Sequence, residues 1–532
     1  MIRSLMLTSL ICASATAQVR YEDILKSPAE NWLTYAGSYN GWRYAPGRQI
    51  TPQNAGSLVS KWVYHVPDAR GLQTTPIVYQ GVMYVTNANN VYALDVQSGR
   101  LIWKYSDTRA ASQKNNRGVG ILGDRVYFTS SDNYLTALDR RSGAMIFTKK
   151  FGNVADGVSS TAPVFIAKDK IIVGHSGSDS GIRGSLAALS ASTGEELWRT
   201  YTIPAKGEPG SETWKGMIEY GGAGTWLSGT YDPELNTIYW TTGNAWPDFN
   251  GTWREGDNLY TSSLLALDLD TGKMKWYFQF TPHDTHDWDA QSWPILLDME
   301  WQGKPRKVVT HANRNGFFYV LDRTTGEFLL GTKLIDNVTW ASGIDAKGRP
   351  IVIPGKEPTP GGNWICPSVK GATNWMSESY NPGTGLLYLI TLEQCGMYTI
   401  SSQTPVPMKN FSGGGATEEG GQVFLRALDP KTGKRVWEYP MTGVGSMWAG
   451  AVSNAGGVVF TGDDDGNFLG IDAKTGKHLW NFNVGERLTA SPIIYEQDGK
   501  QYVAIASATA IFTFGLFEPV KPVPLPKIVI QK

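Results

Sequence analysis

Apolar and polar residues follow one short pattern that recurs along the chain. An apolar segment runs into Ala-Leu-Asp, a turn with Thr-Gly or Ser-Gly follows, and a large side chain stands four positions after the Gly, as in Ala93-Leu-Asp95, Gly99 and Trp103. Two short segments of this kind joined by a tight Gly turn predict a β-hairpin. The seven copies start at Ala93, Ala137, Ala188, Ala266, Val320, Ala427 and Gly470.

The spacing of these copies predicts a repeat architecture. Most copies are 43 to 54 residues apart, but 78 residues separate Ser190 from Asp268 and 107 separate Asp322 from Asp429. The longer interval has room for a further copy without Trp, and we expect Tyr380–Thr391 to form its hairpin. The fold class is therefore all-β, an eight-bladed propeller of four-stranded blades. We expect the recurring Trp to pack between blades.

The composition agrees with this fold and excludes some partners. Gly (60), Trp (20) and Tyr (24) are abundant, and no extended helical period is obvious. The 48 basic residues balance 48 acidic ones without forming a basic block. Nucleic acid and anionic lipid are therefore not expected as main partners.

The N-terminal residues predict export. Arg3, the apolar run Leu5–Cys12 and Ala15-Thr-Ala17 have the order of a signal peptide. This run is too short to span a bilayer, although an uncleaved anchor is the alternative. We expect a signal peptide over residues 1–17, a propeller over 18–517 and a Pro-rich tail over 518–532, in a periplasmic protein without a membrane span.

Two cysteines remain once Cys12 leaves with the signal peptide. Cys366 and Cys395 form an even pair in an exported protein, which favours a disulfide, with two separate buried thiols as the alternative. The chain has no Cys-x-x-Cys-His motif for covalent haem, and no Cys cluster suited to zinc.

Two carboxylates stand two residues apart in the segment Thr281–Asp289, which is rich in His and Trp. In an extended strand or strand end, Asp287 and Asp289 would point to the same side. Two acids on one side repel unless a cation or a shared proton lies between them. The pair therefore indicates a metal site, a proton-transfer site or both, with a solvated loop as the alternative.

The repeat and the Asp287 segment together resemble the quinoprotein alcohol dehydrogenases, over nearly the whole mature chain from Trp32 to about Phe517. That family is built on eight-bladed propellers that use pyrroloquinoline quinone and a bound metal. The resemblance implies that Asp287, in Pro282-His-Asp-Thr-His-Asp287, is the catalytic base. It also implies that Arg314 stabilises charge at the quinone.

The resemblance implies a metal site for one calcium or lanthanide ion. Asn244 in Thr242-Gly-Asn244 matches a ligand, and Asp179 stands where the family has a Glu. Asp287 borders the ion, and Asp289 resembles the extra carboxylate of the lanthanide-using branch. One more anionic oxygen suits the higher charge of a trivalent ion.

Residues that match quinone-binding positions of the family are spread along the chain. Arg suits planar carboxylate groups because it presents a fixed fork, and Trp226 falls on the family's stacking Trp. The positions implied for the cofactor are Gln73, Arg117, Ser160, Ser176, Gly177, Ser178, Trp226, Arg314, Asn374 and Trp448.

Two departures from the family concern the quinone. Ala111-Ser112 stands where the family has a disulfide between adjacent Cys, and Gln73 replaces a Glu. The other family disulfide is compatible with Cys366 and Cys395.

The implied activity is oxidation of a small-molecule alcohol, with electrons passing singly to a separate carrier such as a soluble cytochrome c. A sugar or polyol dehydrogenase is one alternative, and a non-catalytic periplasmic propeller scaffold is another. A homodimer is compatible with the sequence.

Overall fold

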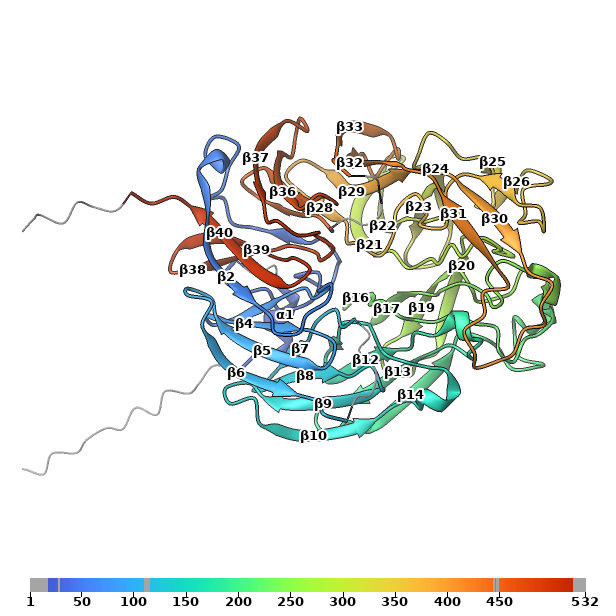
Figure 1. Ribbon diagram of the computed structural model, residues 1–532, viewed down its shortest axis with the longest axis horizontal. Coiled ribbons are helices and arrows are strands. Elements are labelled where there is room, and N and C mark those ends of the chain that lie inside the picture. Colours follow the sequence, from blue (N-terminus) through green and yellow to red (C-terminus); the bar gives the residue numbers. More distant parts are fainter. Residues whose placement is uncertain (1–17, 27–28, 110–114, 444, 446–448, 520–532) are drawn as a thin grey trace, which may run out of the picture.

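Eight antiparallel sheets surround a common axis in the computed structural model, which describes residues 18–26, 29–109, 115–443, 445 and 449–519 (Figure 1). The predicted all-β fold and the count of eight blades are confirmed. The signal peptide, the Ala111-Ser112 pair, Trp448 and most of the Pro-rich tail lie outside the described residues. No helix among the described residues has the length and apolar character of a membrane span.

Each of the first four blades is formed by consecutive segments of the chain. Blade 1 consists of β3 (Ile77–Tyr79), β4 (Val82–Thr86), β5 (Asn90–Asp95) and β6 (Leu101–Ser106). Blade 2 consists of β7 (Gly120–Leu122), β8 (Arg125–Thr129), β9 (Tyr134–Asp139) and β10 (Met145–Lys150). Blade 3 consists of β11 (Phe165–Ala167), β12 (Lys170–Gly174), β13 (Ser185–Ser190) and β14 (Glu196–Tyr201). Blade 4 consists of β16 (Thr230–Asp232), β17 (Thr237–Thr241), β19 (Ser263–Asp268) and β20 (Met274–Gln279).

The second half of the ring repeats this order until the last blade. Blade 5 consists of β21 (Ile295–Trp301), β22 (Lys304–Ala312), β23 (Phe317–Asp322) and β24 (Phe328–Lys333). Blade 6 consists of β28 (Ser379–Asn381), β29 (Leu386–Glu393), β32 (Gln422–Leu428) and β33 (Arg435–Pro440). Blade 7 consists of β34 (Val452–Asn454), β35 (Val458–Gly462), β36 (Asn467–Asp472) and β37 (His478–Asn483), with β1 (Tyr44–Ala45) parallel to β34. Blade 8 consists of β38 (Ile493–Gln497), β39 (Lys500–Ala506), β40 (Ala510–Leu516) and the early strand β2 (Leu58–His65).

The eighth blade is not the one that the sequence predicted. The hairpin at Tyr380–Thr391 is the inner half of blade 6, which also holds the Ala427 copy of the repeat. The long interval is instead occupied by additions outside the ring. These are β25 (Ala341–Ile344) with β26 (Pro350–Val352), and β27 (Asn363–Ile365) with β30 (Gly396–Ile400) and β31 (Gly414–Glu418). Elsewhere β15 (Lys215–Gly216) pairs with β18 (Arg254–Glu255), and α1 (Tyr21–Leu25) precedes the ring.

Where the repeat carries its Trp, the indole joins one blade to the next, as predicted; blades 2 and 5 have Phe147 and Leu330 at this position. The indole of Trp103 in blade 1 donates to the carbonyl of Arg140 in blade 2, and its ring covers Gly143. Gly143 has a positive φ, and a Cβ there would lie 2.5 Å from the ring, so the stack requires Gly. The same bond recurs from Trp198 to Leu269, from Trp276 to Arg323, from Trp437 to Ala473 and from Trp480 to Leu58.

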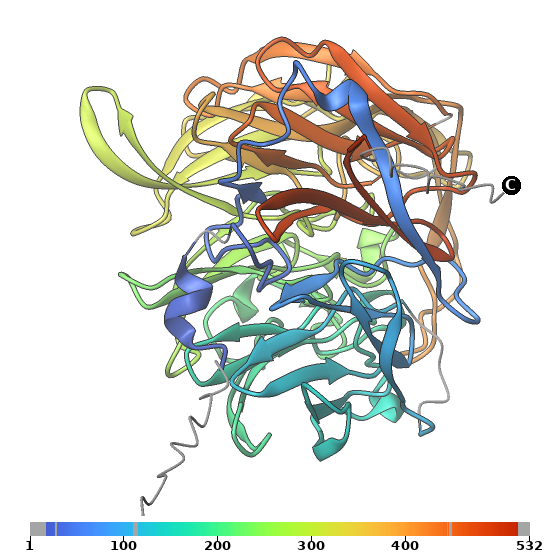
Figure 2. The ribbon, with the colours of Figure 1, turned by 90° about the vertical axis from the view of Figure 1, so that its left-hand side faces the viewer.

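A strand from the start of the chain closes the ring. β2 pairs with β40 in antiparallel register, and Figure 2 shows its blue segment against the red strands of the chain end. Trp62 in β2 stacks on Gly99 of blade 1 and donates to the carbonyl of Val96 at 2.8 Å. The carbonyl of Leu58 in the same strand accepts from Trp480 of blade 7. β2 therefore joins blade 8 to both of its neighbours.

We expect Trp62→Ala to weaken the closure of the ring. Trp62 is 7 % exposed, and truncation of a buried Trp costs about 3–5 kcal/mol. Urea unfolding followed by tryptophan fluorescence should show a lower midpoint for the variant. Trp364→Ala is the matched control, since that side chain is 38 % exposed and its loss should change the midpoint little. Equal midpoints for Trp62→Ala and the wild type would contradict this account of closure.

Candidate active site

The acidic segment between β20 and β21 is a turn that one buried carboxylate organises. Asp284 accepts hydrogen bonds from the backbone N–H groups of His286 (2.9 Å) and Trp288 (2.8 Å). Asp287 has φ +58°, so the segment is not the extended strand that we used to place Asp287 and Asp289 on one side. That part of the sequence argument is wrong, although the two side chains do meet a common group.

That common group is Arg314, which follows β22. Its Nη1 donates to Asp289 Oδ2 at 2.9 Å, and its Nη2 lies 3.8 Å from Asp287 Oδ2. Asp289 also accepts from the indole of Trp226 (3.2 Å) and from the backbone N–H of Asn244 (2.6 Å). Three of the predicted site residues thus converge on the carboxylate of Asp289.

Asn244 links this pair to two further carboxylates. Its Nδ2 lies 2.7 Å from Asp248 Oδ1 and 3.4 Å from Asp179 Oδ1. Asp248 is buried in the loop after Thr242-Gly-Asn244, and the sequence analysis did not name it. An acid four residues beyond Asn244 was the only signal available. Asp179 is exposed at its short 3₁₀ turn, Ser178–Ser180.

Buried negative charge dominates the electrostatics of the site. Burial raises the pKa of Asp289 to about 6, against the opposing effect of Arg314. Burial also raises the pKa of Asp287 and of Asp248 well above the usual range, and nearby carboxylates raise both further. Acids that repel one another in this way are stabilised by a cation between them. Among the described residues, however, no group of three Asp, Glu, His or Cys side chains lies close enough together to bind a metal ion in this conformation. The positive charge next to Asp287 and Asp289 comes from Arg314.

A second part of the site stacks on the other predicted Arg. The guanidinium of Arg117 lies over the ring of Trp226 (5.0 Å to its centroid) and over the ring of Trp375 (4.5 Å). Its Nη1 donates to the carbonyl of Thr161, and its buried Nε has no hydrogen-bond partner. Burial lowers the pKa of Arg117 to about 10. Trp226 contacts both Arg117 and Asp289, so it joins the two parts, and Trp375 is a wall residue that the sequence analysis did not assign.

Small residues line the approach to Trp226. Thr161 Oγ1 lies 2.7 Å from Ser176 Oγ and donates to the carbonyl of Trp226. Ser178 Oγ accepts from the backbone N–H of Gly224, and a Cβ on Gly177 would lie 2.4 Å from the carbonyl of Gly157. Close backbone packing and a positive φ therefore require glycine at position 177.

Three other predicted cofactor residues have less direct roles in the structure. Ser160 is buried, and its backbone N–H donates a hydrogen bond to the carbonyl of Ser131. The side chain of Asn374 caps its own segment through Lys370 and Trp375. Gln73 lines a polar cavity of about 420 Å³, and its buried Oε1 has no hydrogen-bond partner.

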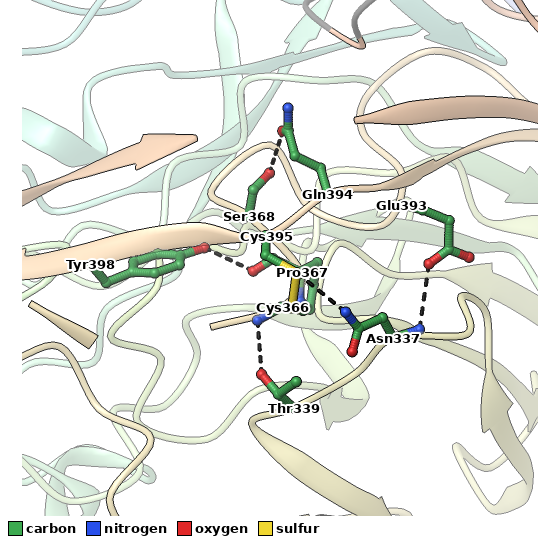
Figure 3. The surroundings of a disulfide bond; sticks show 9 residues. All are labelled: Asn337, Thr339, Cys366, Pro367, Ser368, Glu393, Gln394, Cys395 and Tyr398. Carbon is green, nitrogen blue, oxygen red and sulfur yellow. Dashed lines mark hydrogen bonds between the residues drawn. A yellow bond between two sulfur atoms is a disulfide. The ribbon is translucent and has the colours of Figure 1, made fainter. Parts of the chain in front are cut away.

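The disulfide predicted between Cys366 and Cys395 is present (Figure 3). Cys366 follows β27 and Cys395 precedes β30, next to the end of the ladder that joins these strands. Asn337 Nδ2 lies 3.3 Å from Cys395 Sγ, and Thr339 Oγ1 accepts from the N–H of Cys366. The alternative of two separate thiols is therefore excluded for this structure.

The chain matches known proteins over most of its length. Residues 32–334 match the family model described as glucose/ethanol/alcohol dehydrogenase, β-propeller domain, and residues 420–509 match that of the outer membrane protein assembly factor BamB. Quinoprotein alcohol dehydrogenase PedH of Pseudomonas putida is 36% identical, over 95% of this chain and 91% of PedH.

Solved structures agree with these sequence matches. Quinohemoprotein alcohol dehydrogenase ADHIIG of Pseudomonas putida HK5 superposes with a TM-score of 0.88 at 32% identity, over 96% of this chain and 85% of that one. A europium-containing methanol dehydrogenase superposes with a TM-score of 0.87 at 29% identity, over 93% of this chain and 100% of that one.

The fold and these matches define a propeller of the quinoprotein class. The chain belongs to the family of pyrroloquinoline quinone-dependent alcohol dehydrogenases, and it is an oxidoreductase.

A buried acid that accepts from Ser292, three residues beyond Asp289, gives a test of how burial acts on a carboxyl group in this fold. Burial raises the pKa of Glu378 to about 8; Ser292 Oγ donates to its Oε1, and its Oε2 has no partner. In the folded protein Glu378 thus keeps a proton that the unfolded chain releases above about pH 4.5. This group should therefore lower the free energy of unfolding by about 1.4 kcal/mol per pH unit from pH 4.5 to about pH 8.

We therefore expect Glu378→Gln to remove this slope and to stabilise the protein most at pH 8. Unfolding midpoints measured between pH 4.5 and 8 would show it. Glu300→Gln, at an exposed position of β21, is the control and should keep the wild-type slope. A parallel slope in Glu378→Gln and the wild type would mean that Glu378 is ionised in the folded protein.

Proposed function

We propose that the protein oxidises an alcohol to an aldehyde or ketone with pyrroloquinoline quinone and one bound calcium or lanthanide ion. The observation that carries this proposal is the placement of Arg314 between Asp287 and Asp289, beside the indole of Trp226, in a chain of this family. We further propose that the protein is exported to the periplasm and passes electrons to a separate carrier such as a soluble cytochrome c.

The chemistry of the acidic groups fits a hard cation. Asp179, Asn244, Asp287 and Asp289 would hold it, and their side chains offer the oxygen donors that calcium and lanthanides prefer. Asp248, which contacts Asn244, brings the number of carboxylates in this group to four. Burial and mutual repulsion raise the pKa of Asp287 and of Asp289, and a cation between the two carboxylates would favour their charged forms.

The quinone also finds suitable groups. Trp226 offers a flat face, which Arg117 covers in this structure, and the Nε atoms of Arg117 and Arg314 are buried without partners. Such unpaired donors favour a ligand with carboxylate or carbonyl oxygens. Ser176, Gly177 and Ser178 would supply small polar groups for the quinone, and Gln73, Ser160, Asn374 and Trp448 complete the proposed cofactor set.

Asp287 is the proposed general base. Its carboxylate would accept the proton of the alcohol's hydroxyl group. Arg314 lies 3.8 Å from this carboxylate, favours its charged form and orients the neighbouring Asp289. The quinone, when bound, supplies the hydride acceptor.

A non-catalytic scaffold is the rival function, because residues 420–509 match the assembly-factor model. That match covers two strands of blade 6, the four strands β34–β37 of blade 7 and two strands of blade 8, and all the residues of the Asp287–Arg314–Asn244 group lie outside it. A scaffold has no use for buried carboxylates that repel one another, since each costs stability. This observation favours the enzyme.

Alcohol oxidation should depend on Asp287. Protein reconstituted with the quinone and either ion should reduce a dye with an alcohol as donor, and Asp287→Asn should lower kcat by about 10²–10⁴-fold. Quinone affinity, measured by equilibrium dialysis, should change little because the shape is kept. Full activity of the variant would exclude Asp287 as the base. Absence of any ion-dependent quinone binding by the wild type would favour the scaffold.

Asp289 should decide which ion is preferred. Its extra charge favours a trivalent ion, so Asp289→Ala should weaken terbium binding on the order of tenfold more than calcium binding. Terbium luminescence and calcium competition measure both affinities. Asp257→Asn is the control, because that carboxylate pairs with Arg349 on the surface. Equal losses for the two ions would make Asp289 a structural residue and calcium the better assignment.

A further inference from the structure

Three consecutive backbone carbonyl groups accept hydrogen bonds from side chains at the site. The hydroxyl of Tyr398 donates to Pro367 O at 3.1 Å, and the indole of Trp288 donates to Ser368 O at 2.9 Å. Arg314 Nη2 donates to Val369 O. We call residues Pro367–Val369 the carbonyl row; it follows Cys366 directly.

The carbonyl row contacts the two residues that define the acidic site. Trp288 stands between Asp287 and Asp289 in the chain and is fully buried, and Arg314 is the cation that both carboxylates face. Gly371, two residues beyond the row, packs on Arg314, since a Cβ there would lie 2.5 Å from its Cβ. The N–H of Ala372 donates to the carbonyl of Arg314 at 2.9 Å. The position of the row therefore sets the position of Arg314.

The row is itself held at its disulfide end. Ser368 donates its N–H to the carbonyl of Gln394 (2.8 Å) and its hydroxyl to Gln394 Oε1 (2.7 Å), next to Cys395 (Figure 3). The disulfide joins Cys366 to Cys395 across 29 positions of sequence, with a Cα–Cα distance of 4.3 Å. Without it, residues 366–371 would depend on hydrogen bonds and packing, with no covalent link, to stay against the strand that starts at Gly396.

We propose that the Cys366–Cys395 disulfide is a positioning element of the active site, which fixes Arg314 and Trp288 by holding the carbonyl row against them. This inference rests on the proposed function for its catalytic consequence, but its structural consequence is independent of it. A cross-link that served global stability alone would not need to be coupled to Arg314, the cation that faces Asp287 and Asp289.

The test compares the wild type with the double variant Cys366→Ser/Cys395→Ser. Well below the unfolding temperature, we expect kcat for alcohol oxidation to fall roughly ten- to hundredfold, because small displacements of positioned groups have effects of this size. The KM for the alcohol should change much less. Unchanged kcat would overturn the proposal.

Hydrogen exchange gives a readout that needs neither quinone nor ion. Opening of the disulfide should speed amide exchange in peptides that cover residues 285–290 and 313–316, in addition to 366–396. Exchange that changes only within 366–396 would overturn the proposal. If the wild type shows no quinone-dependent activity, the proposed function fails, and exchange still decides whether the disulfide positions these segments.

Trp103→Phe serves as the control for general loss of stability. It removes a docking bond between blades 1 and 2 and leaves the carbonyl row intact. At matched distance from its unfolding temperature it should keep wild-type kcat and wild-type exchange at 285–290; an equal loss in both variants would overturn the proposal. If the double Ser variant does not fold, apoprotein reduced with a phosphine and then reoxidised provides the same comparison.

Discussion

The rest of the site depends on one constraint, which is that two largely buried carboxylates face a single guanidinium group. Asp287 and Asp289 both face Arg314, and burial raises the pKa of each. Such a cluster persists only if the surrounding fold holds it rigidly, because repulsion would otherwise drive the carboxylates into solvent. The turn capped by Asp284, the indole of Trp226 and the carbonyl row supply that rigidity from three different directions.

The repeat made most of the fold predictable from sequence. A Gly turn and a Trp at constant spacing specify local hairpins and their docking, and both were found as expected. The identity of the eighth blade was not predictable in this way. In the sequence, β2 and its Trp62 lie far from the other strands of blade 8, and no local pattern predicts that β2 pairs with β40. The hairpin at Tyr380–Thr391 was assigned wrongly for the same reason.

The candidate site was predictable in its residue types and less so in its geometry. Asp289, Asn244, Trp226 and Arg314 do come together. Asp287 and Asp289 meet Arg314 through a turn with a positive φ, which the strand argument did not foresee. Asp248 and Trp375 were missed because their roles depend on how separate loops pack, as when Trp375 covers Arg117. Tertiary contacts of this kind leave no period in the sequence.

Closure by β2 also bears on how the chain folds. The strand formed by Leu58–His65 pairs with Ala510–Leu516, so the ring cannot be completed until almost the whole chain is present. Contacts between such distant segments form slowly, because the entropy of a long loop must be lost before the pairing stabilises the product. Seven blades with an open edge would precede the closed ring, and they would expose an unpaired strand. Completion of the ring therefore waits for two segments from opposite parts of the chain to meet, whatever the speed of its hairpins.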